Sequence, residues 1–249
     1  MHVYDGSPAQ ESGLQEGDVI VSADSYEAAS TDLSEFITHV RGEEGTQVHL
    51  VIARSGESDY LEFDITRKNL VLPTVTQKML ENQTGYIQVT EFTEHTVEQF
   101  EDALSELQQE GMTALIVDLR SNPGGMLTSV CSMLDDILPE GLLVYTEDKN
   151  GNRQDYNSTD DKSLDLPLAV LVNGNSASAS EIFAGAIQDR KAGTIIGTTT
   201  YGKGVVQSIL SLKDGSAFKL TTSRYFTPNG TCIQGIGIQP DVELSLIHI

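Results

Sequence analysis

Two apolar runs, each followed by a glycine-containing turn and a helical pattern, place the strongest constraint on the fold. The first run is Ala114–Leu119, followed by the turn 120–125, and the second is Leu168–Val172, followed by Asn173–Asn175. Strands that are apolar throughout are typical of sheets covered on both faces by helices. Turns that follow such strands gather at one edge of the sheet, where functional groups collect. The pattern therefore predicts an α/β fold in which the two glycine-bearing turns meet.

The remaining patterns divide the chain into a small unit over residues 1–68, a linking segment over 69–84 and a larger unit over 85–249. Period-two and period-3.6 spacing of apolar residues distinguishes strands from helices. Residues 151–165 are polar, acidic and without a clear period, which favours a surface excursion. The predicted strands are 18–22, 47–52, 85–89, 194–197, 205–212 and 217–222, and the predicted helices are 32–40, 97–110, 126–138 and 181–190.

Composition excludes several classes of function. The 249 residues carry a formal net charge of -22, from 37 acidic against 15 basic residues, so nucleic acids and anionic membrane surfaces would repel the chain. Cys131 and Cys232 are far apart and have no metal-ligand spacing, so no metal site is predicted, while a disulfide between them is left open. The sequence has no run of about 18 apolar residues, and its first residues do not resemble a signal peptide.

A serine motif and a lysine motif carry the chemistry. Ser176–Glu181 reads Ser-Ala-Ser-Ala-Ser-Glu, and Tyr201–Gly204 reads Tyr-Gly-Lys-Gly. A serine hydroxyl needs a partner that takes its proton, and a lysine kept neutral by burial can serve. The five histidines lie far from both motifs, so a histidine-based triad is not expected. Ser178 and Lys203 are therefore the candidate nucleophile and base.

Each motif also has a purely structural interpretation. Ser178 and Glu181 form a capping-box pattern at a helix start, and the other two serines of the motif compete for the nucleophile role. Lys203 between two glycines is also typical of a solvated turn. Residues 122–125, Asn-Pro-Gly-Gly, can be a simple turn, or glycines that let backbone amides approach a substrate oxygen.

Taken in order along the chain, these motifs resemble the C-terminal (tail-specific) processing peptidases of family S41, which are serine proteases with a PDZ domain. The resemblance rests on the following segments: Gly6–Ala9, Ser12–Leu14, Gly17–Ile20, Asp118–Gly125, Ser176–Glu181, Gln188–Arg190, Tyr201–Gln207 and Gly235–Asp241. It implies a crotonase/ClpP-like α/β catalytic domain over 85–249. It also implies a partial, N-terminally truncated PDZ domain over 1–68, because the match begins inside the PDZ pattern.

Carried over residue by residue, the resemblance makes Ser178 the nucleophile, Lys203 the general base and Gln207 the residue that orients the lysine. It implies an oxyanion hole formed by the amides of Gly124, Gly125 and Ala179. In a straight strand Gln207 would lie roughly 13 Å from Lys203, so either the strand bends after Gly204 or Gln207 contacts the surroundings of Ser178 by another route. No metal or organic cofactor is implied.

The resemblance further implies a serine endopeptidase that cleaves polypeptides near their C-termini, with the PDZ domain capturing the tail. It implies action outside the cytoplasm, in the periplasm or at the cell surface, an upstream membrane tether and a homo-oligomer. Two alternatives stay open. One is a catalytically silent peptide-binding scaffold, and the other is a crotonase-type acyl-CoA enzyme, which shares glycine amides that hold an oxyanion.

Overall fold

The structure is a computed structural model, and it describes residues 3–4, 6–159 and 163–244. The chain forms two compact units, Met1–Leu72 and Pro73–Ile249. The expected linker, residues 69–84, contains strand β5 (Val75–Leu80) and the 3₁₀ turn η1 (Glu81–Gln83), so the second unit begins well before Gly85. Within the described ranges, none of the helices combines the length and the apolar character needed to cross a bilayer.

The first unit is an antiparallel sheet with two helices. Its strands are β1 (Val19–Ala23), β2 (Tyr26–Glu27), β3 (Gln47–Ala53) and β4 (Leu61–Thr66), in the order β2-β1-β3-β4, and its helices are α1 (Pro8–Glu11) and α2 (Leu33–Val40). Asp32 caps α2, because its carboxylate accepts the Ser34 N–H at 2.9 Å. The apolar side chains of α2 are only partly covered, with Phe36 buried and Leu33 exposed. The core residues are Leu14, Ala23, Phe36, Val48, Leu50, Ile52 and Ile65.

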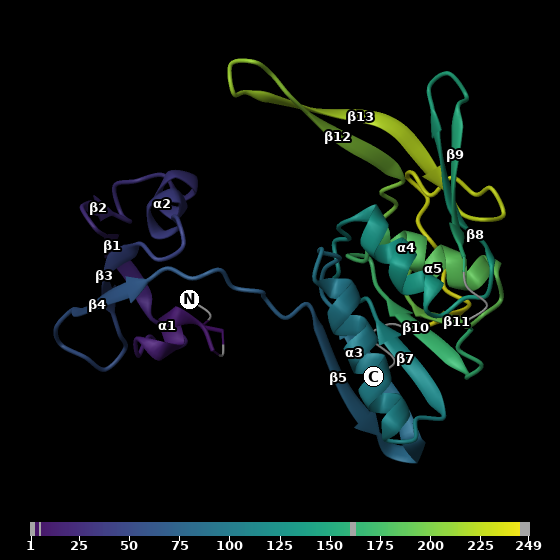
Figure 1. The fold of residues 1–249 in the computed structure, drawn as a ribbon, viewed down its shortest axis with the longest axis horizontal. Helices are drawn as coiled ribbons and strands as arrows, with labels where there is room; N and C mark the ends of the chain where they lie inside the picture. The colour runs from purple at the N-terminus through teal and green to yellow at the C-terminus, as the bar shows by residue number, and fades with distance from the viewer. Residues whose placement is uncertain (1–2, 5, 160–162, 245–249) are drawn as a thin grey trace. The chain divides into compact units, whose positions relative to one another are not determined.

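The second unit is built on a six-stranded sheet in the order β14-β11-β10-β7-β6-β5 (Figure 1). Five neighbouring strands run parallel, and β5 pairs antiparallel at the edge. The strands are β6 (Thr84–Val89), β7 (Ala114–Asp118), β10 (Leu168–Val172), β11 (Thr194–Gly197) and β14 (Val242–Glu243). The mixed α/β class predicted from the apolar runs is confirmed. The neighbouring positions of β7 and β10 bring their two following turns to one edge.

Three helices form a layer beside this sheet. They are α3 (Thr96–Gln109), α4 (Leu127–Asp135) and α5 (Ala179–Asp189), and consecutive helices pack against one another. Their buried faces join the strands in one apolar core that includes Phe92, Phe100 and Phe183. Helix α5 is buried along nearly its whole length, from Ala179 to Ile187. The helix that follows the serine motif is therefore a rigid central element.

A second sheet of four antiparallel strands, in the order β12-β13-β8-β9, completes this unit. Its strands are β8 (Gly141–Asp148), β9 (Arg153–Ser158), β12 (Val205–Ser211) and β13 (Ala217–Phe226). The β12–β13 pair projects as a long ribbon (Figure 1). Strand β9 lies in the segment interpreted as a surface excursion. Residues 153–158 are mostly exposed, as a surface excursion requires, but they form a strand that the sequence did not predict, and residues 160–162 of the same segment lie outside the described residues.

Candidate active site

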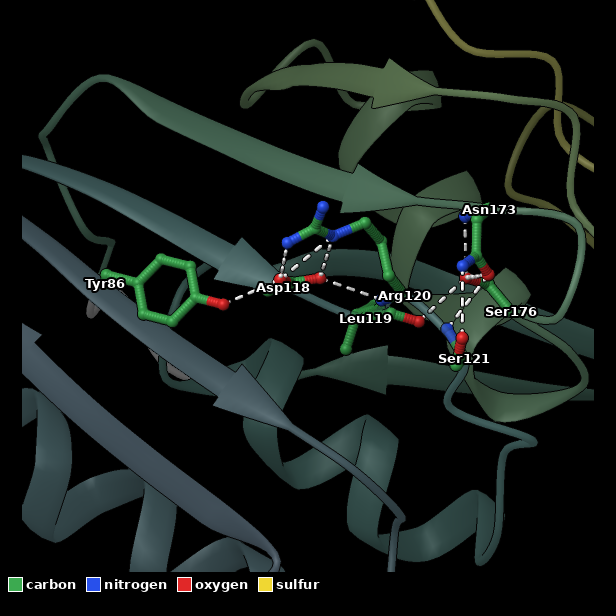
Figure 2. Close-up of polar contacts among 7 residues, drawn as sticks. All are labelled: Tyr86, Asp118, Leu119, Arg120, Ser121, Asn173 and Ser176. Carbon is green, nitrogen blue, oxygen red and sulfur yellow. Dashed lines mark hydrogen bonds and ion pairs between the residues drawn. The ribbon is translucent and has the colours of Figure 1, made fainter. Parts of the chain in front are cut away.

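The two turns at the ends of β7 and β10 are joined by a network of hydrogen bonds (Figure 2). The Ser121 N–H donates to Asn173 Oδ1 at 2.9 Å, and the Asn173 amide donates to Ser121 Oγ at 3.1 Å. Ser176 Oγ donates to the Leu119 carbonyl at 2.7 Å. The expectation that the two turns meet is confirmed. These bonds fix the serine motif against the glycine turn.

Asn122 continues this network towards the nucleophile motif. Its side chain is fully buried and donates to the Val89 carbonyl at 2.9 Å. Its backbone carbonyl accepts the Ala177 N–H and the Ser180 hydroxyl, each at 3.0 Å. A buried amide satisfied on both sides holds its neighbours in one geometry. The sequence showed only a turn residue here, because these partners lie far away along the chain.

The three serines of the motif have different environments. Ser176 and Ser180 are fully buried, and each donates its hydroxyl to a backbone carbonyl of the segment after β7. Ser178 is half-buried and lines a cavity of ≈ 470 Å³. Only Ser178 of the three can therefore meet a substrate.

Ser178 also has a backbone conformation that serine rarely adopts. Its φ of +57° and ψ of −112° place it at a sharp turn between the end of β10 and the start of α5. An ordinary helix cap has extended dihedral angles, and a non-glycine residue with positive φ carries strain that is common at active sites. A strained strand-to-helix turn that presents a serine is the geometry of nucleophile elbows. The cap interpretation alone does not account for this strain.

Lys203 and Gln207 line the same cavity as Ser178. Lys203 is half-buried and Gln207 is exposed. The β12–β13 ladder shifts register between Val206 and Gln207, because Val206 pairs with Ser223 while Gln207 pairs with Thr221. A bulge of this kind re-aims the side chains beside it. The ladder is therefore irregular near Gln207, but the extra residue is Thr222 on β13, and the irregularity lies further along the ribbon than Gly204.

Glu181 connects the serine turn to the lysine segment. Its carboxylate is fully buried and accepts the Ser178 N–H and the Lys203 N–H on one oxygen, each at 2.8 Å. The other oxygen accepts the Thr200 hydroxyl and the Gly202 N–H, each at 2.6 Å. Four donors on one buried carboxylate are strong hydrogen bonds that leave little freedom of position. The capping-box pattern indicated the bond to Ser178, but not the bonds across to residues 200–203.

Tyr225 lines the same cavity as Ser178 and Lys203. Its side chain is buried, and its hydroxyl donates to the Lys203 carbonyl. Burial raises the pKa of Tyr225 well above its ordinary value, so the hydroxyl stays protonated and keeps donating. Glu181 and Tyr225 therefore hold the Lys203 backbone from both its N–H and its carbonyl.

The candidate oxyanion amides differ in availability. The Gly124 N–H donates to Asn122 Oδ1 at 2.8 Å, so the expected role of Gly124 as an oxyanion donor disagrees with the structure. Gly125 and Ala179 line the cavity, and neither N–H has a hydrogen-bond acceptor among the described residues. A Cβ on Gly124 would lie 2.7 Å from the Ser178 Cβ. Gly124 is thus required for close packing against the serine, while Gly125 and Ala179 line the cavity with N–H groups that no described residue accepts.

The described residues show no group of three or more His, Cys, Asp or Glu side chains arranged to hold a metal ion. Cys131 and Cys232 are free thiols, so the disulfide that the sequence left open is not formed.

Asp189, at the end of α5, accepts the Asn229 N–H at 2.8 Å. Arg120 pairs with the buried Asp118 at 2.6 Å, so both residues act in the fold.

Comparison with known proteins identifies the family. Residues 83–244 match the model of Peptidase family S41, and residues 1–54 match a PDZ domain. The chain belongs to peptidase family S41. The segment that matches this family contains every residue of the cavity described above.

Individual relatives agree with this assignment. A "Carboxyl-terminal-processing protease" of Synechocystis sp. is 37% identical over 97% of this chain and 58% of its own length. A "Carboxy-terminal-processing protease" of Bartonella bacilliformis is 39% identical over 96% of this chain and 56% of its own length. The solved structure of a "Photosystem II D1 C-terminal processing protease" has a TM-score of 0.65 and 33% identity, covering 96% of this chain and 66% of that one. The chain thus spans little more than half the length of these curated relatives.

Proposed function

We propose that the chain is a serine endopeptidase that cleaves polypeptides near their C-termini through a Ser178–Lys203 catalytic centre. The observation that carries the proposal is the single cavity lined by the strained Ser178, by Lys203 and by the amides of Gly125 and Ala179. The family and the names of the relatives support hydrolysis of polypeptide tails. Extracytoplasmic action, a homo-oligomer and capture of the tail by the PDZ unit belong to the same proposal, supported by the family alone.

The proposed reaction is acyl transfer to serine. Neutral Lys203 Nζ takes the proton from Ser178 Oγ, which attacks the scissile carbonyl carbon and forms the new C–O bond. The carbonyl oxygen becomes an oxyanion that accepts the N–H groups of Gly125 and Ala179. The C–N bond then breaks as the leaving amine takes a proton from the Lys203 ammonium. A water molecule, deprotonated by Lys203, hydrolyses the acyl-enzyme and restores Ser178.

Gln207 orients the Lys203 ammonium in this proposal. The two side chains line one cavity, and an amide oxygen can accept a hydrogen bond from a lysine. The carboxylate of Glu181 and the hydroxyl of Tyr225 bind the Lys203 backbone instead. In this proposal the bonds to the Lys203 backbone fix where its side chain starts, and Gln207 fixes the position of the ammonium at its end.

The deciding experiment compares Ser178→Ala, Lys203→Ala and the wild-type chain on a peptide library whose cut sites are read by mass spectrometry. We expect each variant to lose at least about 10³-fold in kcat/KM while keeping its fold, because nucleophile and base act as a unit. Lys213→Ala, an exposed lysine in the turn of the same hairpin, is the matched control and should cleave normally. Full activity in a folded Lys203→Ala variant would remove the lysine from the mechanism.

A serine-reactive fluorophosphonate separates this proposal from the two alternatives. The peptidase should be labelled on Ser178, and the label should disappear in Ser178→Ala. A silent scaffold would bind peptides without either labelling or cleavage. An acyl-CoA enzyme would show competition between acyl-CoA and peptide for the cavity.

A further inference from the structure

The cavity beside Ser178 has no acidic side chain in its described lining, although the chain is strongly acidic. Its lining contains two lysines, Lys203 and Lys219, and no aspartate or glutamate among the described residues. The nearby carboxylate of Glu181 is fully buried, with both of its oxygens occupied by four donors. In a chain with 37 acidic and 15 basic residues, a cavity whose described lining has lysines and no carboxylate is an exception. With Lys203 as the proposed neutral base, Lys219 is the lining residue whose charge attracts anions.

Lys219 lies on the hairpin face that carries Gln207. In the β12–β13 ladder Gln207 pairs with Thr221, and Ile209 pairs with Lys219. Because side chains alternate between the two faces of a strand, residues 207, 219 and 221 share one face. Lys219 therefore follows Gln207 by two residues along the ribbon, about 7 Å further from the Lys203 end of the strand.

The Lys219 ammonium is available to a ligand. The residue is exposed, and no described carboxylate forms an ion pair with it. A peptide bound across Ser178 in an extended conformation advances about 3.3 Å per residue. Because Ser178 and Lys219 line one cavity of ≈ 470 Å³, a group within about four residues of the scissile bond, roughly 13 Å of extended chain, comes within reach of Lys219. A carboxylate is the group that a lysine at the rim of a cavity attracts best.

We propose that Lys219 is a specificity-determining residue that binds a carboxylate of the peptide substrate within about four residues of the scissile bond. This inference rests on the proposed peptidase function and adds a chemical preference to it. The carboxylate can belong to an Asp or Glu side chain or to the free end of the peptide. Both sources present the same group, so the experiment must separate them.

The test uses the full chain and a peptide series of one parent sequence. Aspartate is placed in turn at each of four positions on either side of the cut site, and each peptide has an asparagine counterpart. Every peptide is made with a free and with an amidated C-terminus. We expect the wild type to prefer the aspartate or free-acid member of one pair by about fivefold in kcat/KM, the range of a partly solvated ion pair. High salt should weaken this preference.

Three variants assign the preference to one side chain. Lys219→Met keeps the length of the side chain without its charge, and the ratio between the two members of the pair should fall to about one. Lys219→Glu should invert the ratio. Lys213→Met, in the turn of the same hairpin and outside the cavity lining, should keep the wild-type ratio. An unchanged ratio in Lys219→Met, or a wild type that shows no preference at any position, overturns the inference.

A binding measurement separates this inference from the proposed catalysis. In the Ser178→Ala background, fluorescence anisotropy reports the Kd of the aspartate and asparagine peptides without cleavage. A preference that disappears in Ser178→Ala/Lys219→Met supports the carboxylate subsite even if the wild type hydrolyses nothing. Equal Kd values for both peptides before and after the Lys219 change would refute the subsite, whatever the fate of the peptidase proposal.

Discussion

At the scale of single residues, three serines of one short motif have three different roles in the structure. Ser176 and Ser180 stabilise the turns by donating to buried carbonyls, while Ser178 keeps a strained φ and faces a cavity. The sequence alone could not choose among them, because spacing says nothing about burial. In the structure, the carbonyls of Leu119 and Asn122 accept the hydroxyls of Ser176 and Ser180, so Ser178 is the serine left facing the cavity.

Asp118 shows how one buried charge is held near the site. Burial is the largest single effect and opposes ionisation, but hydrogen bonds from Arg120 and Tyr86 outweigh it, so the pKa of Asp118 is lowered from 3.8. A carboxylate whose pKa is lower in the folded state binds fewer protons than in the unfolded state. Its stabilisation is therefore present above pH 3.8 and is lost as the pH falls through the folded-state value.

This pKa predicts the acid response of an Asp118→Asn variant. At pH 7 we expect a loss of about 1–3 kcal/mol in the free energy of unfolding, since charged hydrogen bonds to Arg120 disappear. The difference from the wild type should shrink as the pH falls below 3.8 and through the lowered folded-state pKa, where Asp118 itself becomes protonated. Urea unfolding across this range measures it. Asp155→Asn, which breaks the exposed pair with Arg153, is the control and should cost little at any pH.

At the scale of elements, α5 and the segment before β12 are held together by Glu181. Glu181→Gln keeps the shape of the side chain but turns an amide N–H₂ towards N–H donors. We expect kcat to fall at least tenfold with a much smaller change in KM, because Lys203 loses its position relative to Ser178. A loss of about 1–3 kcal/mol in the free energy of unfolding should accompany it.

The control for this variant is Glu101→Gln, which changes an exposed carboxylate on α3. It should leave both kcat and stability unchanged. The rate of fluorophosphonate labelling gives a further readout, since it reports the reactivity of Ser178 directly. A folded Glu181→Gln chain with the wild-type kcat and labelling rate would show that the buried carboxylate has no positioning role.

The strands that the sequence predicted well are those with apolar patterns. The runs at β7 and β10 are buried on the sheet, and α3 and α5 begin within two residues of the predicted starts. Strand β9 was missed because its side chains are largely polar and exposed, and β5 because its polar, exposed middle interrupts the apolar pattern, so backbone pairing with a neighbour supports both strands. Edge strands of this kind carry no periodic signal.

The candidate site was predictable to the extent that it follows local motifs. Ser178, Lys203 and Gln207 were placed by motif, and the structure brings all three to one cavity. Tyr225 and Lys219 were not predictable, since they reach the cavity only through the pairing of β13 with its neighbours. The occupied amide of Gly124 was equally hidden, because it depends on the rotamer of a buried Asn122.

At the scale of the whole molecule, two separate apolar cores support the two units. The smaller core surrounds Ile52, and the larger includes Phe100. Because stability grows with the apolar area that a unit buries, the unit Met1–Leu72 should unfold at a lower temperature than Pro73–Ile249. Calorimetry should therefore show two transitions.

Two matched core substitutions assign these transitions. Ile52→Ala should lower the midpoint temperature of the first transition only, and Phe100→Ala that of the second only. Each substitution should reduce the free energy of unfolding of its own unit by about 2–5 kcal/mol. Neither should change the midpoint of the other transition, because sites without shared partners are additive. A single transition that moves equally in both variants would show that the two units unfold as one.

The bridge formed by Glu181 also bears on how the protein is made. Chains emerge from the ribosome N-terminus first, and domains fold as they appear. A nascent chain that ends at Asp189 contains Ser178 and Glu181. It does not yet contain Thr200, Gly202 or Lys203, which donate to the Glu181 carboxylate in the folded protein. Translation of about fifteen further residues supplies both these donors and the proposed base. Before these residues are made, the proposed centre lacks its base and the donors that fix Glu181, so the proposed chemistry cannot act on the shorter nascent chain.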